Sequence, residues 1–88
     1  KAELEDWKNG WHGVSLGLKQ SELEQLIQLL QDLKKDPEQH FHLSSLYQGE
    51  SGLGDIEVYV LPECKPDNMR LSSVALPPNS EVKANNAL

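Results

Sequence analysis

The chain has 88 residues, and its 14 carboxylates against 8 lysines and arginines give a formal net charge of −6. A chain of this length forms one domain and leaves no room for a second domain or a deep substrate cavity. Arg70 is the only arginine, so the chain lacks the basic patch that direct nucleic-acid binding needs. The scattered carboxylates fit either an ordinary solvated surface or one that meets a basic partner.

Cysteine usage and hydropathy exclude further classes of protein. Cys64 is the only cysteine, which excludes an internal disulfide framework and a cysteine metal cluster. The sequence shows no signal peptide and no apolar run long enough to span a bilayer. We therefore expect a cytoplasmic protein without membrane contact.

The N-terminal region contains one strand pattern. Residues 1–9 are charged and predict a frayed start or a short helical turn. In residues 11–18, Val14, Leu16 and Leu18 alternate with small residues, and this period of two is typical of a strand. We expect these three apolar side chains to face the core.

The segment 21–35 predicts an amphipathic helix around which the fold is built. Ser21 and Glu24 form a capping-box pattern at its start, and Asp36-Pro37 predicts its end. The apolar residues that recur at helical spacing are Leu23, Leu26, Ile27, Leu30 and Leu33, with Leu29 at the edge of the stripe.

Two further strands follow the helix. Residues 39–47 and 55–61 both alternate, and the glycine-rich segment 48–54 between them predicts a turn, so the two strands should form a hairpin. Apolar side chains of both strands should face the core. The side chains expected to point outward are His40, His42, Ser44, Asp55, Glu57 and Tyr59.

Residues 69–76 predict one optional last strand, and residues 77–88 predict a flexible tail. The sequence thus indicates a single α+β domain over residues 1–76. We expect a small two-layer domain with one helix packed on a mainly antiparallel sheet of three to four strands, in the order β-α-β-β with the optional final strand.

An enzymatic site is not expected. Cys64 lies in a proline-rich loop without a nearby histidine, no serine lies in a nucleophile elbow, and no glycine-rich loop precedes a helix as phosphate binding requires. His40 and His42 form an H-x-H pair that would project from one strand face, and Glu57 or Asp55 on the next strand could add a carboxylate. Because nothing in the sequence fixes a third ligand, we expect no metal or other cofactor and keep a metal-binding or sensory domain as an alternative.

The outward sheet face is the best candidate for a binding surface. Histidines, carboxylates and a tyrosine lie together there, and tyrosine and tryptophan combine a large contact area with a polar tip. The residues predicted to bind a partner are His40, His42, Asp55, Glu57, Tyr59 and, near one end, Trp11.

Residues 13–61 resemble a known family. The succession GVSLGL, SELEQLIQLLQDLKKDP, HFHLSS and GDIEVYV is similar to small immunity proteins of bacterial polymorphic toxin systems, in particular the immunity protein 32 family. The most distinctive segments are those of His40 to His42 and of Asp55 to Tyr59. One departure is Lys19-Gln20, where such families often have Thr-Pro, and it moves the expected cap to Ser21.

The resemblance implies a non-enzymatic protein that binds a cognate toxin of the same cell and blocks its active site. A nuclease is one candidate for that toxin, since its basic groove would suit an acidic inhibitor. The alternatives are the metal-binding or sensory domain and a mobile-element inhibitor of a host nucleic-acid enzyme. A homodimer stays open.

Overall fold

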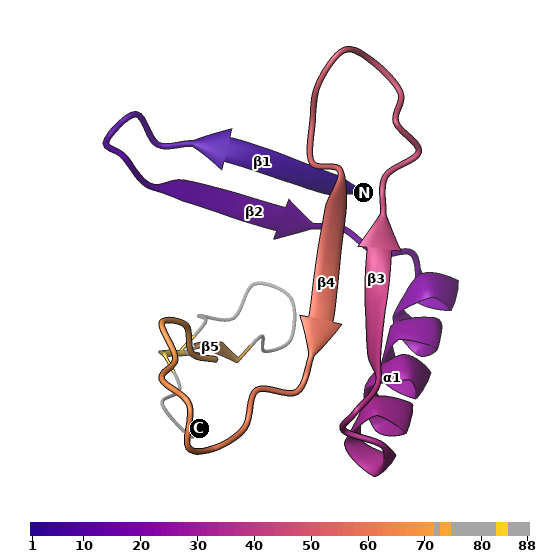
Figure 1. Cartoon of the computed structure of the whole chain (residues 1–88). Coiled ribbons are helices and arrows are strands. Elements are labelled where there is room, and N and C mark those ends of the chain that lie inside the picture. The colour runs from indigo at the N-terminus through magenta and orange to yellow at the C-terminus, as the bar shows by residue number, and fades with distance from the viewer. Residues whose placement is uncertain (72, 75–82, 85–88) are drawn as a thin grey trace.

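The computed structural model describes residues 1–71, 73–74 and 83–84 as an α+β arrangement (Figure 1). One helix is combined with three antiparallel sheets of two strands each, which confirms the predicted α+β class. The elements in chain order are β1 (Ala2–Asp6), β2 (His12–Leu16), α1 (Gln20–Lys35), β3 (His40–Ser44), β4 (Asp55–Tyr59), β5 (Ser73–Val74) and β6 (Lys83–Ala84).

The N-terminal segment is a strand, so the predicted frayed start or helical turn in residues 1–9 is wrong. β1 pairs with β2 in an antiparallel hairpin, in which Leu4 lies opposite Val14 and Ala2 lies opposite Leu16. The alternation of Ala2 and Leu4 with glutamates gives one apolar and one acidic face, as strand geometry requires. Pairing with β2 satisfies backbone groups that a frayed segment would leave to water.

Short polar side chains close the turn between β1 and β2. The carboxylate of Asp6 accepts a hydrogen bond from the Lys8 backbone N–H at 2.8 Å, and the side-chain oxygen of Asn9 accepts one from the Trp11 N–H at 3.0 Å. Gly10 has a φ of 95°, a left-handed conformation that glycine adopts without a steric penalty. These local bonds fix the hairpin register.

The helix α1 starts one residue earlier than the sequence predicted. Its N-cap is Lys19, not Ser21, and the Glu22 carboxylate accepts a hydrogen bond from the Lys19 backbone N–H at 2.9 Å. A lysine side chain has no acceptor atom, so only the carboxylate half of a capping box is formed. The C-terminal end agrees with the prediction, because the helix stops at Lys35, just before Asp36 and Pro37.

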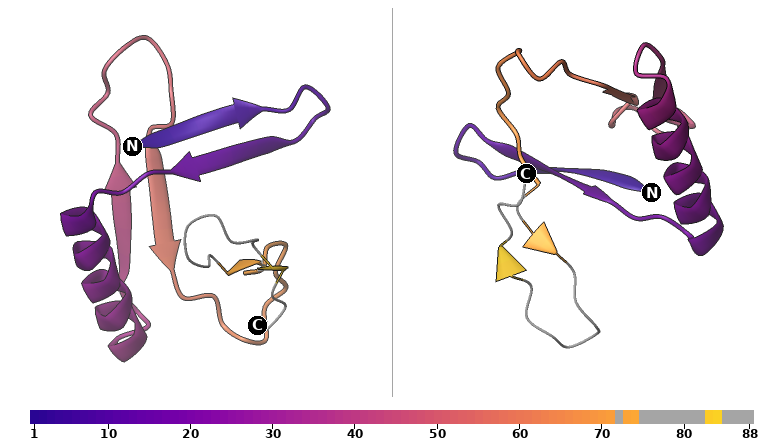
Figure 2. Two further views of the ribbon diagram at one scale, coloured as in Figure 1. Left: turned by 180° about the vertical axis from the view of Figure 1, so that it is seen from behind. Right: turned by 90° about the horizontal axis from the view of Figure 1, so that it is seen from below.

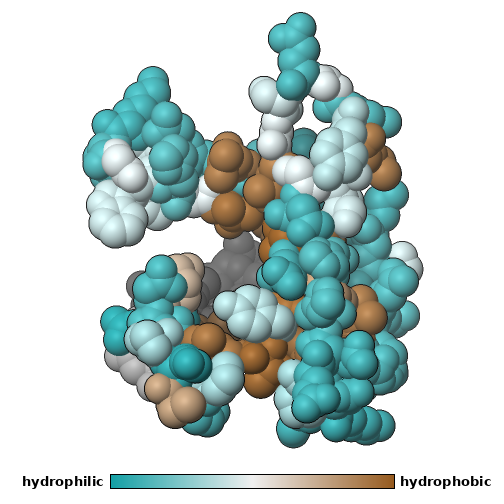
Figure 3. Space-filling view, viewed as in Figure 1, coloured by the Kyte–Doolittle hydropathy of each residue, from teal (hydrophilic) through white to brown (hydrophobic). Residues whose placement is uncertain are grey.

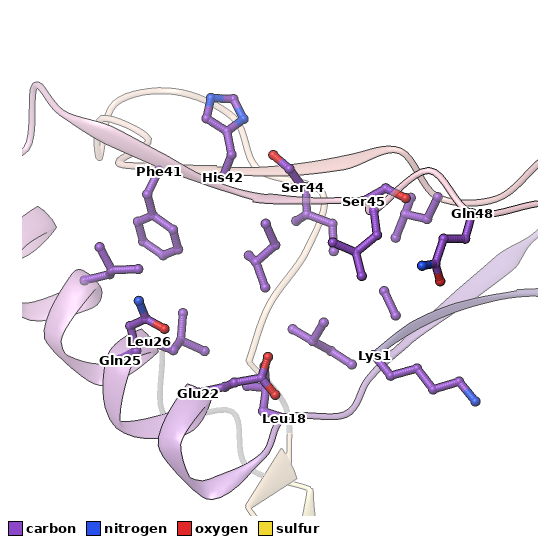
Figure 4. A pocket seen from close by; sticks show the side chains of 17 residues that line it. Lys1, Leu18, Glu22, Gln25, Leu26, Phe41, His42, Ser44, Ser45 and Gln48 are labelled. Carbon is purple, nitrogen blue, oxygen red and sulfur yellow. The ribbon is translucent and has the colours of Figure 1, made fainter.

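The predicted hairpin after the helix is confirmed. β3 and β4 pair so that Phe41 lies opposite Val58 and Leu43 lies opposite Ile56. These four side chains are half-buried, whereas the residues that alternate with them are exposed. Close to the helix, Phe41 points toward α1 and His42 points away from it (Figure 4), so α1 covers the apolar face of the hairpin.

The strands do not join into one sheet. The β1–β2 and β3–β4 hairpins are separate two-stranded sheets, and the β1–β2 hairpin extends away from α1, with its turn at the far end (Figure 2). Of the predicted strand 69–76, Ser73 and Val74 form β5, which pairs with Lys83 and Ala84 of β6. Residues 72, 75–82 and 85–88, and with them most of the predicted tail, lie outside the described residues.

This arrangement leaves many apolar side chains exposed. Within the described part of the chain Leu33 is the one buried side chain, at 6% exposure. Val14 is 55% and Leu16 42% exposed, so the expectation that both face the core is wrong; only Leu18 of that group is half-buried. The reason is that the β1–β2 hairpin stands apart from the helix. Apolar residues are visible beside the β3–β4 hairpin, near the start of β1 (Figure 3).

Among the described residues, no helix has both the length and the apolar character needed to cross a membrane.

Candidate functional site

The exposed side of the β3–β4 hairpin gathers polar side chains from both strands. Its cross-strand pairs are His40 with Tyr59, His42 with Glu57 and Ser44 with Asp55. Each strand alternates, and the apolar half of each faces α1, so the polar half must face outward. We call these residues the outer face: His40, His42, Ser44, Asp55, Glu57 and Tyr59, all of them exposed. Hydrophilic residues cover this side of the hairpin (Figure 3).

A hydrogen-bonded group lies at one end of the outer face. Nδ1 of His42 is 2.9 Å from Oδ2 of Asp55, and the Ser44 hydroxyl donates to Oδ1 of the same carboxylate over 3.2 Å. A carboxylate only accepts hydrogen bonds, so Nδ1 of His42 carries the hydrogen. The bond from His42, with a smaller effect of the Ser44 bond, holds the pKa of the Asp55 carboxyl below its ordinary value of 3.8. His42 is thereby oriented with Nε2 free of this contact.

The two histidines lie side by side along β3. Their ring centroids are 5.0 Å apart and the rings are nearly perpendicular, at 81°. A ligand atom of each histidine and one of Glu57 all lie within 4.8 Å of one another. Among the described residues, the structure therefore groups Glu57 with both histidines as a candidate third ligand, whereas the sequence offered Glu57 and Asp55 alike.

Trp11 is not part of this group. It lies at the turn of the β1–β2 hairpin, where it is 72% exposed. The neighbouring His12 faces Asp6 across that hairpin, with Nε2 3.7 Å from the carboxylate. Of the predicted partner-binding residues, the structure brings together those on β3 and β4 and leaves Trp11 at the turn of the other hairpin.

A pocket of about 730 Å³ lies between α1 and the β3–β4 hairpin (Figure 4). Its walls come from the start of β1, the end of β2, α1, β3 and the loop before β4. Leu26, Leu29, Phe41 and Ile56 are among its apolar lining residues. The sequence analysis expected no room for a deep substrate cavity, whereas the structure has this pocket between the helix and the hairpin.

The pocket lacks a catalytic pair among its described lining residues. Its titratable side chains are those of Lys1, Glu22 and His42. Glu22 caps the helix, and His42 points away from the pocket (Figure 4). Cys64 is a free, exposed thiol in the segment after β4. Acid–base or nucleophilic catalysis needs groups within hydrogen-bond reach of one another, and this lining does not provide them.

Two parts of the candidate site were not recognised as functional from the sequence. No sequence pattern indicated the pocket, since it depends on the distance between the helix and the β3–β4 hairpin. Ser44 was expected only to point outward, whereas it also bonds Asp55; the signal for this role is its place opposite Asp55 in the hairpin register.

Comparison of the chain with protein-family models, with curated proteins and with solved structures found no match.

Proposed function

We propose that this protein is a non-enzymatic inhibitor that binds a cognate bacterial toxin through the outer face of the β3–β4 hairpin. The observation that carries the proposal is the gathering of His40, His42, Asp55, Glu57 and Tyr59 on one exposed surface. The resemblance of residues 13–61 to toxin-immunity proteins, whose most distinctive segments are these same two strands, supports the class of partner.

The charge of the molecule supports a partner with a basic surface. Asp55 and Glu57 lie on the outer face, and Glu3 and Glu5 are exposed on β1, within a chain of net charge −6. Opposite charges accelerate the encounter of two proteins and align them. A nuclease toxin, whose active-site groove binds phosphate, has the complementary charge.

Tyr59 provides the apolar contact area on this surface. Its side chain is 58% exposed, and tyrosine is among the residues that contribute most to protein interfaces. An interface that combines Tyr59, at the end of β4, with the carboxylates of the same strand would block a basic groove by both contact and charge. Truncation of Tyr59 and of Glu57 should therefore weaken binding for different physical reasons.

The first test is capture of the partner. The tagged protein is recovered from the cells that encode it at low and at high salt, and the retained proteins are identified by mass spectrometry. The expected result is one stoichiometric protein with a basic nuclease domain, with less of it retained at high salt because screening weakens surface charge pairs. The purified partner should then lose its activity when the tested protein is added in equimolar amount.

Variants locate the interface. Glu57→Ala and Tyr59→Ala should each reduce binding and inhibition by roughly tenfold or more. Glu24→Ala is the matched control, because Glu24 is an exposed glutamate on α1 and lies off the outer face. A partner that binds both outer-face variants as tightly as the wild type, or an inhibitor that leaves the partner active, would refute the proposal.

A further inference from the structure

We infer that His40, His42 and Glu57 form a binding site for one divalent transition-metal ion, for which zinc is the best fit, and that Asp55 is the positioning residue for His42. This property is separate from the proposed inhibition of a toxin, because it concerns the isolated protein and an inorganic ligand.

The first argument is the geometry of the ligand atoms. They already lie within 4.8 Å of one another in the structure. In a tetrahedral zinc site with bonds of about 2.0–2.2 Å, ligand atoms are about 3.3–3.6 Å apart. The remaining difference is on the order of an ångström, and it requires only rotations of exposed side chains. The backbone register, which places Glu57 directly opposite His42, needs no change.

The second argument is the support behind His42. Metal-bound histidines commonly donate their other ring N–H to a carboxylate, which fixes the tautomer and the orientation of the ring. Here Nδ1 of His42 lies 2.9 Å from Asp55, and the Ser44 hydroxyl holds the other oxygen of that carboxylate. The bond occupies Nδ1 of His42, so in the neutral imidazole Nε2 is the nitrogen that remains to bind a metal. This support makes the group more than a chance neighbourhood of exposed side chains.

The ligand set indicates the class of metal. Two imidazoles and one carboxylate suit zinc and its neighbours copper, nickel and cobalt, and they do not suit calcium or magnesium, which prefer oxygen ligands alone. With three protein ligands, the fourth tetrahedral position is left to water. Because all three side chains are exposed, the ion would bind at the surface and exchange with solvent.

The test is a titration of the metal-free full chain with zinc chloride by isothermal titration calorimetry. Cobalt(II) serves as a second probe, since its visible absorption reports a tetrahedral site. We expect one ion per chain. His40→Ala, His42→Ala and Glu57→Gln should each weaken binding by at least tenfold, and Asp55→Ala should weaken it by about 10–100-fold, as the loss of an outer-shell partner does.

Two matched controls remove other potential ligands. His12→Ala deletes the histidine that faces an aspartate on the other hairpin, and Cys64→Ser deletes the free thiol; both should leave the affinity unchanged. Circular dichroism of the metal-free variants verifies that each is folded. The inference is overturned if the wild type binds no zinc, or if binding survives in the folded His40→Ala and Glu57→Gln proteins.

Discussion

The indole ring of Trp7 lies over Gly13, on the opposite strand of the β1–β2 hairpin. A β-carbon at Gly13 would lie 2.8 Å from Cζ2 of Trp7 and 3.1 Å from Nε1. The contact closes the end of the hairpin next to the turn, where the Trp7 N–H also donates to the Trp11 carbonyl at 3.1 Å. A side chain at Gly13 is thus opposed by the close approach of a ring and not by the backbone angles.

Gly13→Ala should displace the Trp7 ring. The ring is 53% exposed and free to rotate outward, so we expect a loss of about 1 kcal/mol or less in the free energy of unfolding. The measurement is a red shift of tryptophan fluorescence, excited selectively above the tyrosine absorption, in a Trp11→Phe background where Trp7 is the one tryptophan left. Gly17→Ala is the control, because its β-carbon would meet only the Lys1 carbonyl at 3.7 Å. An unchanged spectrum in Gly13→Ala would contradict the contact.

Leu33 should be the most sensitive position of the helix. Leu33→Ala is expected to lower the free energy of unfolding by about 2–5 kcal/mol, since it removes the buried side chain and leaves a cavity. Leu30→Ala on the same helix should cost clearly less, because Leu30 is 45% exposed. Urea titrations followed by circular dichroism compare the two. Equal losses of unfolding free energy in the two variants would show that the apolar stripe of the helix is buried evenly, which would contradict the structure.

The helix cap gives a prediction that separates the structure from the sequence pattern. Glu22→Ala should destabilise α1 by about 0.5–2 kcal/mol, because it frees the Lys19 N–H that the carboxylate satisfies. Ser21→Ala should have little effect, although the sequence placed the cap there. Thermal melts at 222 nm measure both. The reverse order of effects would restore the cap to Ser21.

Asp55 should titrate below its ordinary pKa of 3.8. A carboxyl whose pKa is lowered in the folded state stabilises the fold above its unfolded pKa, and this contribution is lost as the pH falls through the folded value. Asp55 therefore favours folding at neutral pH and ceases to do so in strongly acidic solution. NMR titration of the side-chain carboxyl in chelator-treated protein measures the shift. His42→Ala should bring the pKa back toward 3.8, and Ser44→Ala should do so to a smaller extent.

The β3–β4 hairpin could be predicted because each of its strands carries a complete pattern. Phe41 and Leu43, and opposite them Ile56 and Val58, alternate with polar residues, and glycines lie between the two runs. The two-residue alternation and a single turn are enough to assign both the strand pairing and the side chains that face outward. The end of α1 could be predicted equally well, since Pro37 disfavours the helical backbone conformation in the residue before it.

The remaining features depend on relationships that a linear pattern does not contain. In β1, Ala2 and Leu4 alternate with glutamates, but two apolar residues among charges do not reveal a strand until β2 lies beside them. The choice of Glu57 over Asp55 as the third ligand depends on the hairpin register. The separation into two sheets depends on where the β1–β2 hairpin extends, which no residue of its strands specifies.

The small buried core also determines how the protein responds to temperature. Unfolding gains heat capacity chiefly from newly hydrated apolar surface, and here most large apolar side chains of the described residues are already in contact with solvent. The isolated chain should therefore have a flat stability curve and a broad melting transition. A partner that covers this surface should bind with a strongly negative change in heat capacity. A sharp, cooperative melt would then be a property of the complex and not of the chain alone.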